Sequence, residues 1–325
     1  MTDAGAGSVA TSSPDVSGSR ALRTRVSRGR NRYLLGAACV ALCAIMVMPI
    51  VLTTLASLKT TGEAAASPPT WFPSEISLDG YQRLWDYQFG LPQYVLNSLG
   101  TALLTIVFTL GLTIPAGFAL ARLPVPGKEF LFVFLLMALI IPYQALLTPI
   151  FLMFAQTYSF TLPVSLDVAN LHIGPSISFK LVNSMIGLAI LHTTIQLPFS
   201  LFIMRNSFEA VPLELEEAAV IDGGGTFQVL RRVLLPAIVP AIVTVALFAF
   251  ITSWNEFLGA VVLMSKASSF TLPVILAAAR TETSLGGTDW GMLQAGIVIS
   301  MIPCVLFYLL LQRYYVSGLT QGALK

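Results

Sequence analysis

Long stretches without charge constrain this chain more than any other feature. Six stretches of 23 or more residues contain no Asp, Glu, Lys or Arg: 33–58, 87–121, 130–166, 181–204, 233–255 and 290–312. A helix needs about 20 apolar residues to cross the hydrocarbon core of a bilayer. The spacing therefore predicts an all-α polytopic membrane protein with six transmembrane helices, near 34–55, 95–119, 131–155, 182–204, 234–256 and 291–312. Barrel strands would instead show alternating segments of about 10 residues.

The overall charge content excludes other classes of protein. Charged residues make up 10% of the chain, against about 25% in a typical soluble domain. A soluble enzyme and a disordered chain need a more polar composition. The net charge of +2 indicates neither a nucleic-acid partner nor an acidic one. Because charged residues are so few, we expect membrane lipid to surround most of the chain.

The positions of the basic residues predict the orientation. With the N-terminus inside, 13 of the 18 Lys and Arg residues fall in the segments on the inner side. Cytoplasmic segments carry the excess of Lys and Arg in membrane proteins. We therefore expect a multi-pass protein of the cell membrane with both termini in the cytoplasm.

Residues 1–32 differ from the rest of the chain. They are rich in Ser, Gly, Ala and Arg, which predicts a disordered, Arg-rich cytoplasmic tail that contacts anionic lipid, followed by one domain over 33–325. A cleaved signal peptide is the alternative. The uncharged run of 26 residues exceeds a signal-peptide core of about 7–15 residues, so we expect an uncleaved anchor.

The sequence predicts no catalytic or metal-ligating residues. Cys39, Cys43 and Cys304 lie in apolar runs and are expected to be packing thiols. His172 and His192 lack metal-ligand spacing with any Cys, Asp or Glu. No phosphate-binding G-x-x-x-x-G-K-[ST] is present, so we expect no enzyme activity and no cofactor bound by this chain.

The loop over 205–236 is the most informative polar segment. Pro212 suits a first helical turn, and the acids that follow suit the positive end of a helix dipole. Gly223, Gly224 and Gly225 are expected to end that helix, because Gly tolerates a positive φ. The pattern predicts a short helix, a sharp turn and a second helix that lie along the cytoplasmic surface.

The small residues of this helix indicate a contact surface. Ala218 and Ala219 allow a partner to approach closely, and Glu217 and Asp222 could pair with basic groups across the contact. The alternative is a solvated amphipathic loop in which Ala serves helix propensity.

The same loop resembles that of a known family. Glu217-Ala218-Ala219, Gly223 and Val233-Leu234-Leu235-Pro236 match the pattern E-A-A-x3-G-x9-I-x-L-P of binding-protein-dependent ABC importer permeases, with Val233 in place of Ile. Further stretches over 33–325 resemble the carbohydrate-importer branch: Ser57-Leu58-Lys59, Asn97-Ser98, Ala119-Leu120-Ala121-Arg122, Pro198-Phe199, Trp254-Asn255-Glu256-Phe257, Thr271-Leu272-Pro273 and the tail 312–325.

The resemblance implies the fold, function and partners. It implies a type I ABC importer permease that moves a sugar or related carbohydrate. It also implies two ABC ATPase subunits that carry ATP and Mg, a second permease of different sequence and an extracytoplasmic solute-binding protein. The ATPase-coupling surface would consist of Glu217, Ala218, Ala219, Asp222, Gly223 and Pro236. The tail 318–325 resembles a segment that reaches the ATPases.

Two segments are expected on the outer side of the membrane, where they could contact the solute-binding protein. Residues 157–180 form an extracytoplasmic insert that is longer than the connection usual in the family. It either touches the solute-binding protein or is a neutral elaboration. The loop 264–289 resembles the one that probes the binding protein, and Gly286-Gly287 suits a flexible tip.

Polar residues within the spans are candidates for the solute pathway, because polar groups there usually face a cavity or another helix. The candidates are Asn97, Gln144, Trp254, Asn255 and Glu256. Asn, Gln, Glu and aromatic side chains suit sugars. Packing between helices is the alternative role for each of them.

Two other classes of transporter are the alternatives. One is an ABC permease for glycerol-3-phosphate or another small solute. The other is an ion-coupled secondary transporter, which would usually place charges near the bilayer midplane or show inverted repeats. Glu256 is the acid closest to a span, and it lies at an end.

Overall fold

The computed structural model describes residues 17–156, 158–161, 166–168, 171–173, 176–279 and 288–322. The chain divides into two units, residues 1–53 and residues 54–325. The first unit contains most of α1 (Ser17–Ser57). The second contains the remaining elements.

Helix α1 begins earlier than the sequence predicts. The expected disordered tail covers 1–32, but the backbone of residues 17–32 is helical and continues into the apolar span. Adding residues to a formed helix costs far less than nucleating one, and Arg, Ala and Leu are good helix formers. The predicted boundary at 33 is therefore wrong for 17–32, whereas 1–16 lie outside the described residues.

Four continuous spans and two bent ones account for the six predicted crossings. Within the described residues, the continuous ones are Tyr33–Ser57, Leu91–Arg122, Met185–Glu209 and Trp290–Gln312. Two further pairs of helices qualify only together: Lys128–Ile140 with Tyr143–Ala155, bent by 101°, and Thr226–Ala237 with Val239–Asn255, bent by 74°. The spans predicted near 131–155 and 234–256 therefore each correspond to a bent pair of helices, and the sequence analysis did not predict the bends.

Proline explains both bends. Pro142 lies between η1 (Ala138–Ile140) and α6 (Tyr143–Ala155). The second bend falls at Ile238, between α10 (Leu235–Ala237), which follows a π-helical segment, η2 (Leu230–Leu234), and α11 (Val239–Asn255), whose first turn contains Pro240. Proline lacks the N–H that a continuing helix needs, and its ring collides with the preceding turn.

The other helices of the second unit follow in chain order. They are α2 (Thr61–Ala64), α3 (Asp79–Trp85), α4 (Leu91–Arg122), α5 (Lys128–Met137), α7 (Met185–Glu209), α8 (Leu213–Ile221), α9 (Thr226–Val229), α11 (Val239–Asn255), α12 (Leu258–Leu263), η3 (Ala267–Ser269), α13 (Leu272–Ala279) and α14 (Trp290–Gly322).

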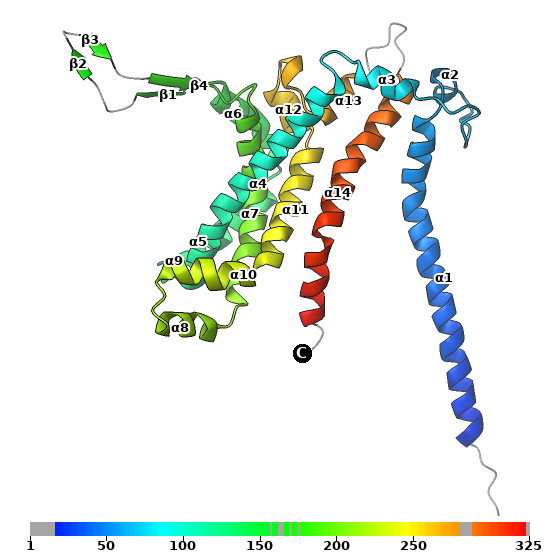
Figure 1. Ribbon diagram of the computed structural model, residues 1–325, viewed down its shortest axis with the longest axis horizontal. Helices are drawn as coiled ribbons and strands as arrows, with labels where there is room; N and C mark the ends of the chain where they lie inside the picture. The colour runs from blue at the N-terminus through cyan, green and yellow to red at the C-terminus, as the bar shows by residue number, and fades with distance from the viewer. Residues whose placement is uncertain are drawn as a thin grey trace, which may run out of the picture. The chain divides into compact units, whose positions relative to one another are not determined.

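Helices α4, α7 and α11 pack together as the centre of the bundle (Figure 1). At Gly117 of α4 an added Cβ would lie 2.8 Å from the Cβ of Met204 in α7, so a small residue lets the two backbones approach. One end of the bundle carries α8 and is called the α8 end below. The other carries α6, α12 and α13 and is called the α12 end.

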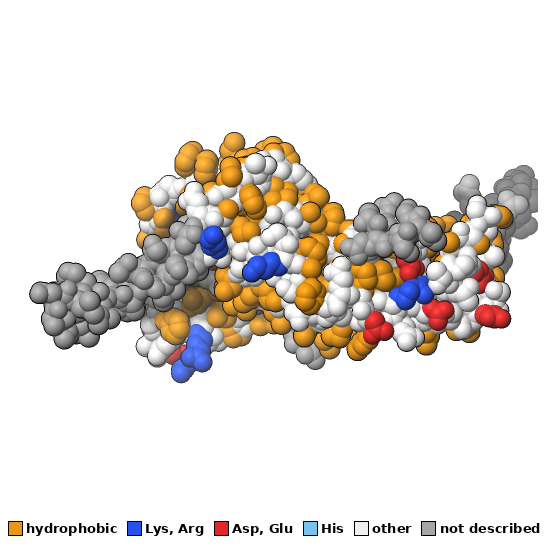
Figure 2. Space-filling view, turned by 90° about the horizontal axis from the view of Figure 1, so that it is seen from above, with side chains coloured by type: hydrophobic (Ala, Val, Ile, Leu, Met, Phe, Trp, Pro, Cys, Tyr) orange, Lys and Arg blue, Asp and Glu red, His pale blue; other side chains and the backbone are white. Residues whose placement is uncertain are grey.

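Three apolar clusters fill the second unit. One surrounds Tyr94 and Trp254, a second surrounds Met204 and Phe208 towards the α8 end, and a third joins α6, α7 and α12 around Leu191. Figure 2 looks onto the α12 end, where apolar side chains cover much of the face and acidic side chains gather in one part of it. Along the helices, large apolar side chains such as Leu103, Phe134 and Leu310 are exposed, which suits lipid and subunit contacts rather than water.

The insert contains strands that the sequence does not predict. β1 (Tyr158–Thr161) pairs antiparallel with β4 (Ser176–Phe179), and β2 (Leu166–Val168) pairs antiparallel with β3 (Leu171–Ile173). Alternating Ser and apolar residues suit a two-sided ribbon. The bundle itself is all-α, as predicted.

Candidate functional site: two polar centres at opposite ends of the bundle

The predicted coupling loop folds as a helix, a turn and a second helix. Pro212 directly precedes α8, where its φ of −56° suits the entry to a helix, and Glu214 and Glu216 occupy the first turn. After the turn, α9, η2 and α10 lead to the bend at Ile238. The predicted helix–turn–helix over 205–236 is confirmed.

Gly223 ends α8 in a way that requires glycine. Its φ is +82°, and its N–H donates to Val220 O at 2.9 Å while Gly224 N–H donates to Ala219 O at 2.9 Å. These two bonds satisfy carbonyls that the helix end leaves open, as in a Schellman motif. The spacing between Ala219 and Gly223 is the spacing this motif needs.

The two alanines of α8 face different ways. Ala218 is exposed, whereas Ala219 is partly buried against the cluster around Met204 and Phe208. Behind the helix end, Ala219, Asp222 and Gly223 line a hollow of about 240 Å³ together with Gln228 and Arg232. The outward surface of α8 consists of Leu213, Glu214, Leu215, Glu217, Ala218, Val220 and Ile221, of which Ile221 is 84% exposed.

Arginines hold the α8 end together. Arg122, the last residue of α4, forms an ion pair with Glu216 at 2.5 Å. Arg205 of α7 pairs with Glu129 of α5 at 2.6 Å and with Glu209 at 2.8 Å, and its guanidinium lies 4.1 Å from the centre of the Phe132 ring. These pairs join α4 to α8 and α5 to α7.

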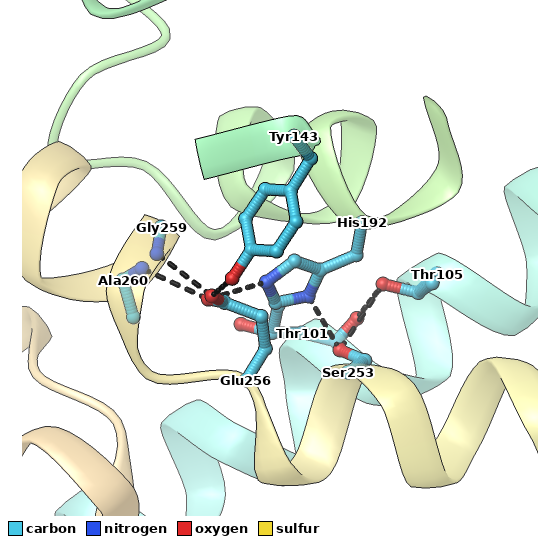
Figure 3. A network of polar contacts seen from close by, with 8 residues as sticks. All are labelled: Thr101, Thr105, Tyr143, His192, Ser253, Glu256, Gly259 and Ala260. Atoms are coloured by element: carbon cyan, nitrogen blue, oxygen red, sulfur yellow. Dashed lines mark hydrogen bonds and ion pairs between the residues drawn. The ribbon is translucent and has the colours of Figure 1, made fainter. Parts of the chain in front are cut away.

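The α12 end is organised around one buried carboxylate. Glu256 accepts hydrogen bonds from Tyr143 OH at 2.9 Å, Gly259 N–H at 2.8 Å and Ala260 N–H at 3.0 Å, and His192 Nε2 lies 3.2 Å away (Figure 3). The residue is 9% exposed. It therefore joins α6, α7 and the start of α12.

The network continues from the imidazole into the bundle. His192 Nδ1 lies 2.8 Å from Ser253 Oγ, which lies 3.3 Å from Thr105 Oγ1 of α4. Donation from Nε2 to the carboxylate leaves Nδ1 of a neutral ring to accept from the Ser253 hydroxyl. The set of Thr105, Tyr143, His192, Ser253 and Glu256 is called the Glu256 network below.

Most of the predicted solute-pathway residues are engaged in protein contacts. Asn97 is buried and donates to Ser268 O and Phe270 O, both at 2.9 Å. Trp254 is buried and donates to Ser300 O at 3.0 Å. With Glu256 they fasten the loops and helices of the α12 end. Asn255 is exposed and donates to Ile251 O at 2.9 Å.

Gln144 is the predicted pathway residue that lines a cavity. Near the break between η1 and α6, a cavity of about 320 Å³ is bounded by Pro142, Tyr143, Gln144, Thr194 and apolar residues of α6 and α7. Gln144 is exposed. Irregular backbone at membrane depth is tolerated only inside protein or along a water-filled cavity, so the break is not a surface suited to lipid.

The partners that build these centres are not predicted from the sequence. Arg122 enters only within the stretch 119–122, Glu216 only as one of the acids that suit the helix dipole after Pro212, and His192 only as a residue without metal-ligand spacing. One signal was available: a His within an uncharged span needs a polar partner. The partner itself could not be read, because Glu256 is 64 residues away.

Other predicted features fall where side chains are not described or lie outside the described residues. Gly286 and Gly287 are among 280–287, and residues 323–325 of the tail are also outside. Residues 318–322 are helical backbone of α14. Within the described residues, no group of three or more His, Cys, Asp or Glu side chains could hold a metal ion.

Comparison with known proteins identifies the family. Residues 113–321 match the model of the binding-protein-dependent transport system inner membrane component. The chain belongs to this family of ABC transporter permeases, and the resemblance seen in the sequence is confirmed.

Particular relatives agree with that assignment. The chain is 30% identical over 280 residues to the diacetylchitobiose uptake system permease protein DasC of Streptomyces coelicolor, covering 86% of this chain and 92% of that one. It is also 30% identical to the trehalose transport system permease protein SugB of Mycobacterium tuberculosis, with the same coverage.

A solved structure shows the same fold. A chain of a bacterial ABC transporter involved in the import of the acidic polysaccharide alginate superposes with a TM-score of 0.67 at 23% identity, covering 90% of this chain and 97% of that one. The described helices therefore adopt the all-α fold of an ABC importer permease.

Proposed function

We propose that this chain is the transmembrane permease subunit of an ATP-driven importer for a sugar or related carbohydrate. The relatives named for diacetylchitobiose and trehalose support the solute class. The exposed surface of α8 carries the mechanistic part of the proposal. A short, capped helix with an apolar and acidic outer face, held at one end of a helix bundle, suits the groove of another protein.

The partner at α8 is an ATPase subunit. Ile221, Val220 and Leu213 offer apolar area, and Glu217 and Asp222 offer charge at its edge. Burial of apolar side chains supplies affinity, and the acids select a basic partner. Two ATPase subunits would bind ATP and Mg, so this chain carries no catalytic residues of its own.

The membrane orientation follows from charge. The α8 end lies in the cytoplasm, because the basic residues gather on that side of the spans. The α12 end and the insert then face outward, where an extracytoplasmic solute-binding protein delivers the solute. A second permease of different sequence completes the pathway.

The solute passes the break between η1 and α6. Gln144 and Asn255 are the predicted pathway residues that remain exposed in this chain. Their amides can exchange hydrogen bonds with sugar hydroxyls. Asn97, Trp254 and Glu256 do not contact the solute in this proposal. They hold the helices around the pathway in place.

Purification and transport test this proposal together. The tagged chain is purified from its membrane without added nucleotide, reconstituted with the proteins that copurify, and assayed with labelled disaccharides and glycerol-3-phosphate. We expect an ATPase and a second permease to copurify, and ATP-dependent uptake of a carbohydrate. Uptake driven by an ion gradient without an ATPase would overturn the proposal, and uptake of glycerol-3-phosphate alone would overturn the solute class.

A bulky residue on α8 tests the docking surface. Because Ala218 is exposed and Ala219 packs inward, Ala218→Trp should weaken retention of the ATPase without disturbing the bundle. Ala66→Trp is the matched control, because Ala66 is exposed at the other end. Equal ATPase retention by the wild type and Ala218→Trp would count against docking at this face.

A further inference from the structure

Two adjacent acids of α8 have opposite surroundings. Glu217 is exposed, whereas the Glu216 side chain is only 14% exposed and pairs with Arg122, whose own side chain is 15% exposed. Residues next to each other on a helix lie about 100° apart around its axis. The contact at Glu216 therefore determines which way Glu217 and Ala218 face.

Arg122 contacts α8 at two points. Its Nε lies 2.5 Å from Glu216 Oε1, and its Nη2 donates to Val211 O at 2.5 Å. Val211 lies in the turn before the helix, and Glu216 lies in the first turn of the helix. One guanidinium thus restrains both the entry and the rotation of α8.

The base of this contact is rigid. Arg122 is the last residue of α4, and α4 packs along α7 and α11. One turn earlier, Phe118 meets Phe208 of α7 edge to face, with ring centres 5.8 Å apart. A displacement of α8 is therefore passed to the end of a helix that runs through the whole bundle.

We propose that Arg122 is the positioning residue of the coupling helix, which sets the rotation of α8 and links it to α4. This inference rests on the proposed function, since it assumes that an ATPase engages α8. The link requires a guanidinium: one planar group donates from Nη2 to Val211 O and holds its Nε in ion-pair contact with Glu216, whereas a lysine ammonium is a point charge on a flexible stem.

A simpler role for Arg122 is also open to test. A cation in the last turn of a helix stabilises the helix dipole, and a lysine would serve that purpose as well. Arg122→Lys therefore separates the two roles, because it keeps the charge and removes the fork.

The experiment measures coupling in the complete reconstituted transporter. Uptake and solute-stimulated ATP hydrolysis are measured for Arg122→Lys, Arg122→Gln, Glu216→Gln and the double variant Arg122→Gln/Glu216→Gln. We expect the number of solutes moved per ATP to fall about tenfold in each, which is within the usual range of coupling between sites. The double variant should lose no more than either single variant, because all three remove the same contact.

Lys128→Gln is the matched control. Lys128 is a partly buried cation at the same end of the bundle, and its Nζ donates to Leu123 O at 3.4 Å. We expect its coupling ratio to match that of the wild type, and Lys128→Gln combined with Glu216→Gln should match Glu216→Gln alone.

The outcomes separate this inference from the proposed function. If the wild type transports and Arg122→Lys couples normally, the positioning role is wrong and the proposed function stands. Additive losses in the double variant would equally overturn the Arg122–Glu216 link. A fall in the amount of assembled complex that matches the fall in uptake would assign Arg122 to folding alone. If no ATPase copurifies with the wild type, the proposed function itself fails.

Discussion

At the α12 end of the bundle Glu256 collects contacts from three helices in a buried site, whereas at the α8 end Arg122 and Arg205 pair with carboxylates. His192, in the first centre, is 1% exposed, while Glu129, in the second, has a side chain that is 66% exposed. Removing a buried partner leaves unsatisfied donors with no access to water. The partly exposed carboxylates of Glu129 and Glu209 can exchange their contacts with water at little cost, although Arg205 and the Arg122–Glu216 pair are largely buried.

The two ends of the bundle are restrained to different degrees. The Glu256 network fixes α6, α7, α11 and α12 as one body. The arginine contacts hold α8 and α5 in defined positions but allow them to be displaced when a partner binds. We infer that the α8 end is the adjustable one and that the α12 end is its stable counterpart.

The largest expected effect is on the Glu256 network. Glu256→Ala should lower the free energy of unfolding by about 3 kcal/mol, because it leaves buried donors without an acceptor. Glu217→Ala is the matched exposed control and should change it by less than about 0.5 kcal/mol. Unfolding of the full chain in detergent measures both. Equal free energies of unfolding for the two variants would show that the Glu256 network does not stabilise the α12 end.

The next effect tests the arginine contacts. Arg205→Lys keeps the charge but loses the fork that reaches Glu129 and Glu209 and the stacking on Phe132, so we expect a loss of about 1.5 kcal/mol. Arg231→Lys, at an exposed position, should cost nothing measurable. The same unfolding assay applies. If Arg205→Lys exceeded the loss of Glu256→Ala, the α8 end would be the more rigid one.

A smaller effect is expected at the end of α8. Gly223→Ala places a Cβ on a residue with a φ of +82°, which costs about 1 kcal/mol. Gly225→Ala is the control, because its φ is −74° and nothing lies within 4 Å of an added Cβ. Amide exchange at Asp222 and Gly224 should accelerate only in Gly223→Ala. Unchanged exchange there would show that the cap contributes little to α8.

The smallest effect concerns an ion pair beyond the spans at the α12 end. Arg83 Nε lies 2.7 Å from Asp289 Oδ2. Burial raises the pKa of Asp289, but the hydrogen bonds from Arg83 and from Met292 N–H outweigh it and lower the pKa overall. The pair therefore stabilises the fold above the ordinary Asp pKa of about 4 and loses this contribution as the pH falls below it.

Asp289→Asn removes this dependence. The stability difference between the wild type and Asp289→Asn should be under about 1 kcal/mol at pH 7, because Arg83 is partly exposed, and should vanish in acid. Thermal unfolding at several pH values measures it. A difference that grows as the pH falls would contradict the assigned direction of the pKa.

Much of the coupling loop could be predicted from local chemistry. Gly223 is suited to the positive φ that ends α8, whatever surrounds it. The number of candidate spans was also predictable, because each uncharged stretch is long enough to cross a bilayer. The bends near Pro142 and Pro240 were not, since proline is compatible with a kinked continuous helix or a full break.

The roles of the polar residues in the spans could not be predicted in the same way. Asn97 and Glu256 were equally plausible as solute contacts and as packing groups. Asn97 meets a carbonyl 173 positions away, and Glu256 meets Tyr143 across 113 positions. No local pattern encodes such pairs.

The membrane class, the family and the helix–turn–helix at the α8 end can be predicted from the sequence, because charge spacing, proline and glycine act over short distances along the chain. The inward orientation of Glu216, the outward orientation of Glu217 and the sharing of Glu256 by three helices depend on tertiary contacts. A hydrogen bond needs two partners within about 3 Å, and only folding brings residues so far apart in sequence to that distance.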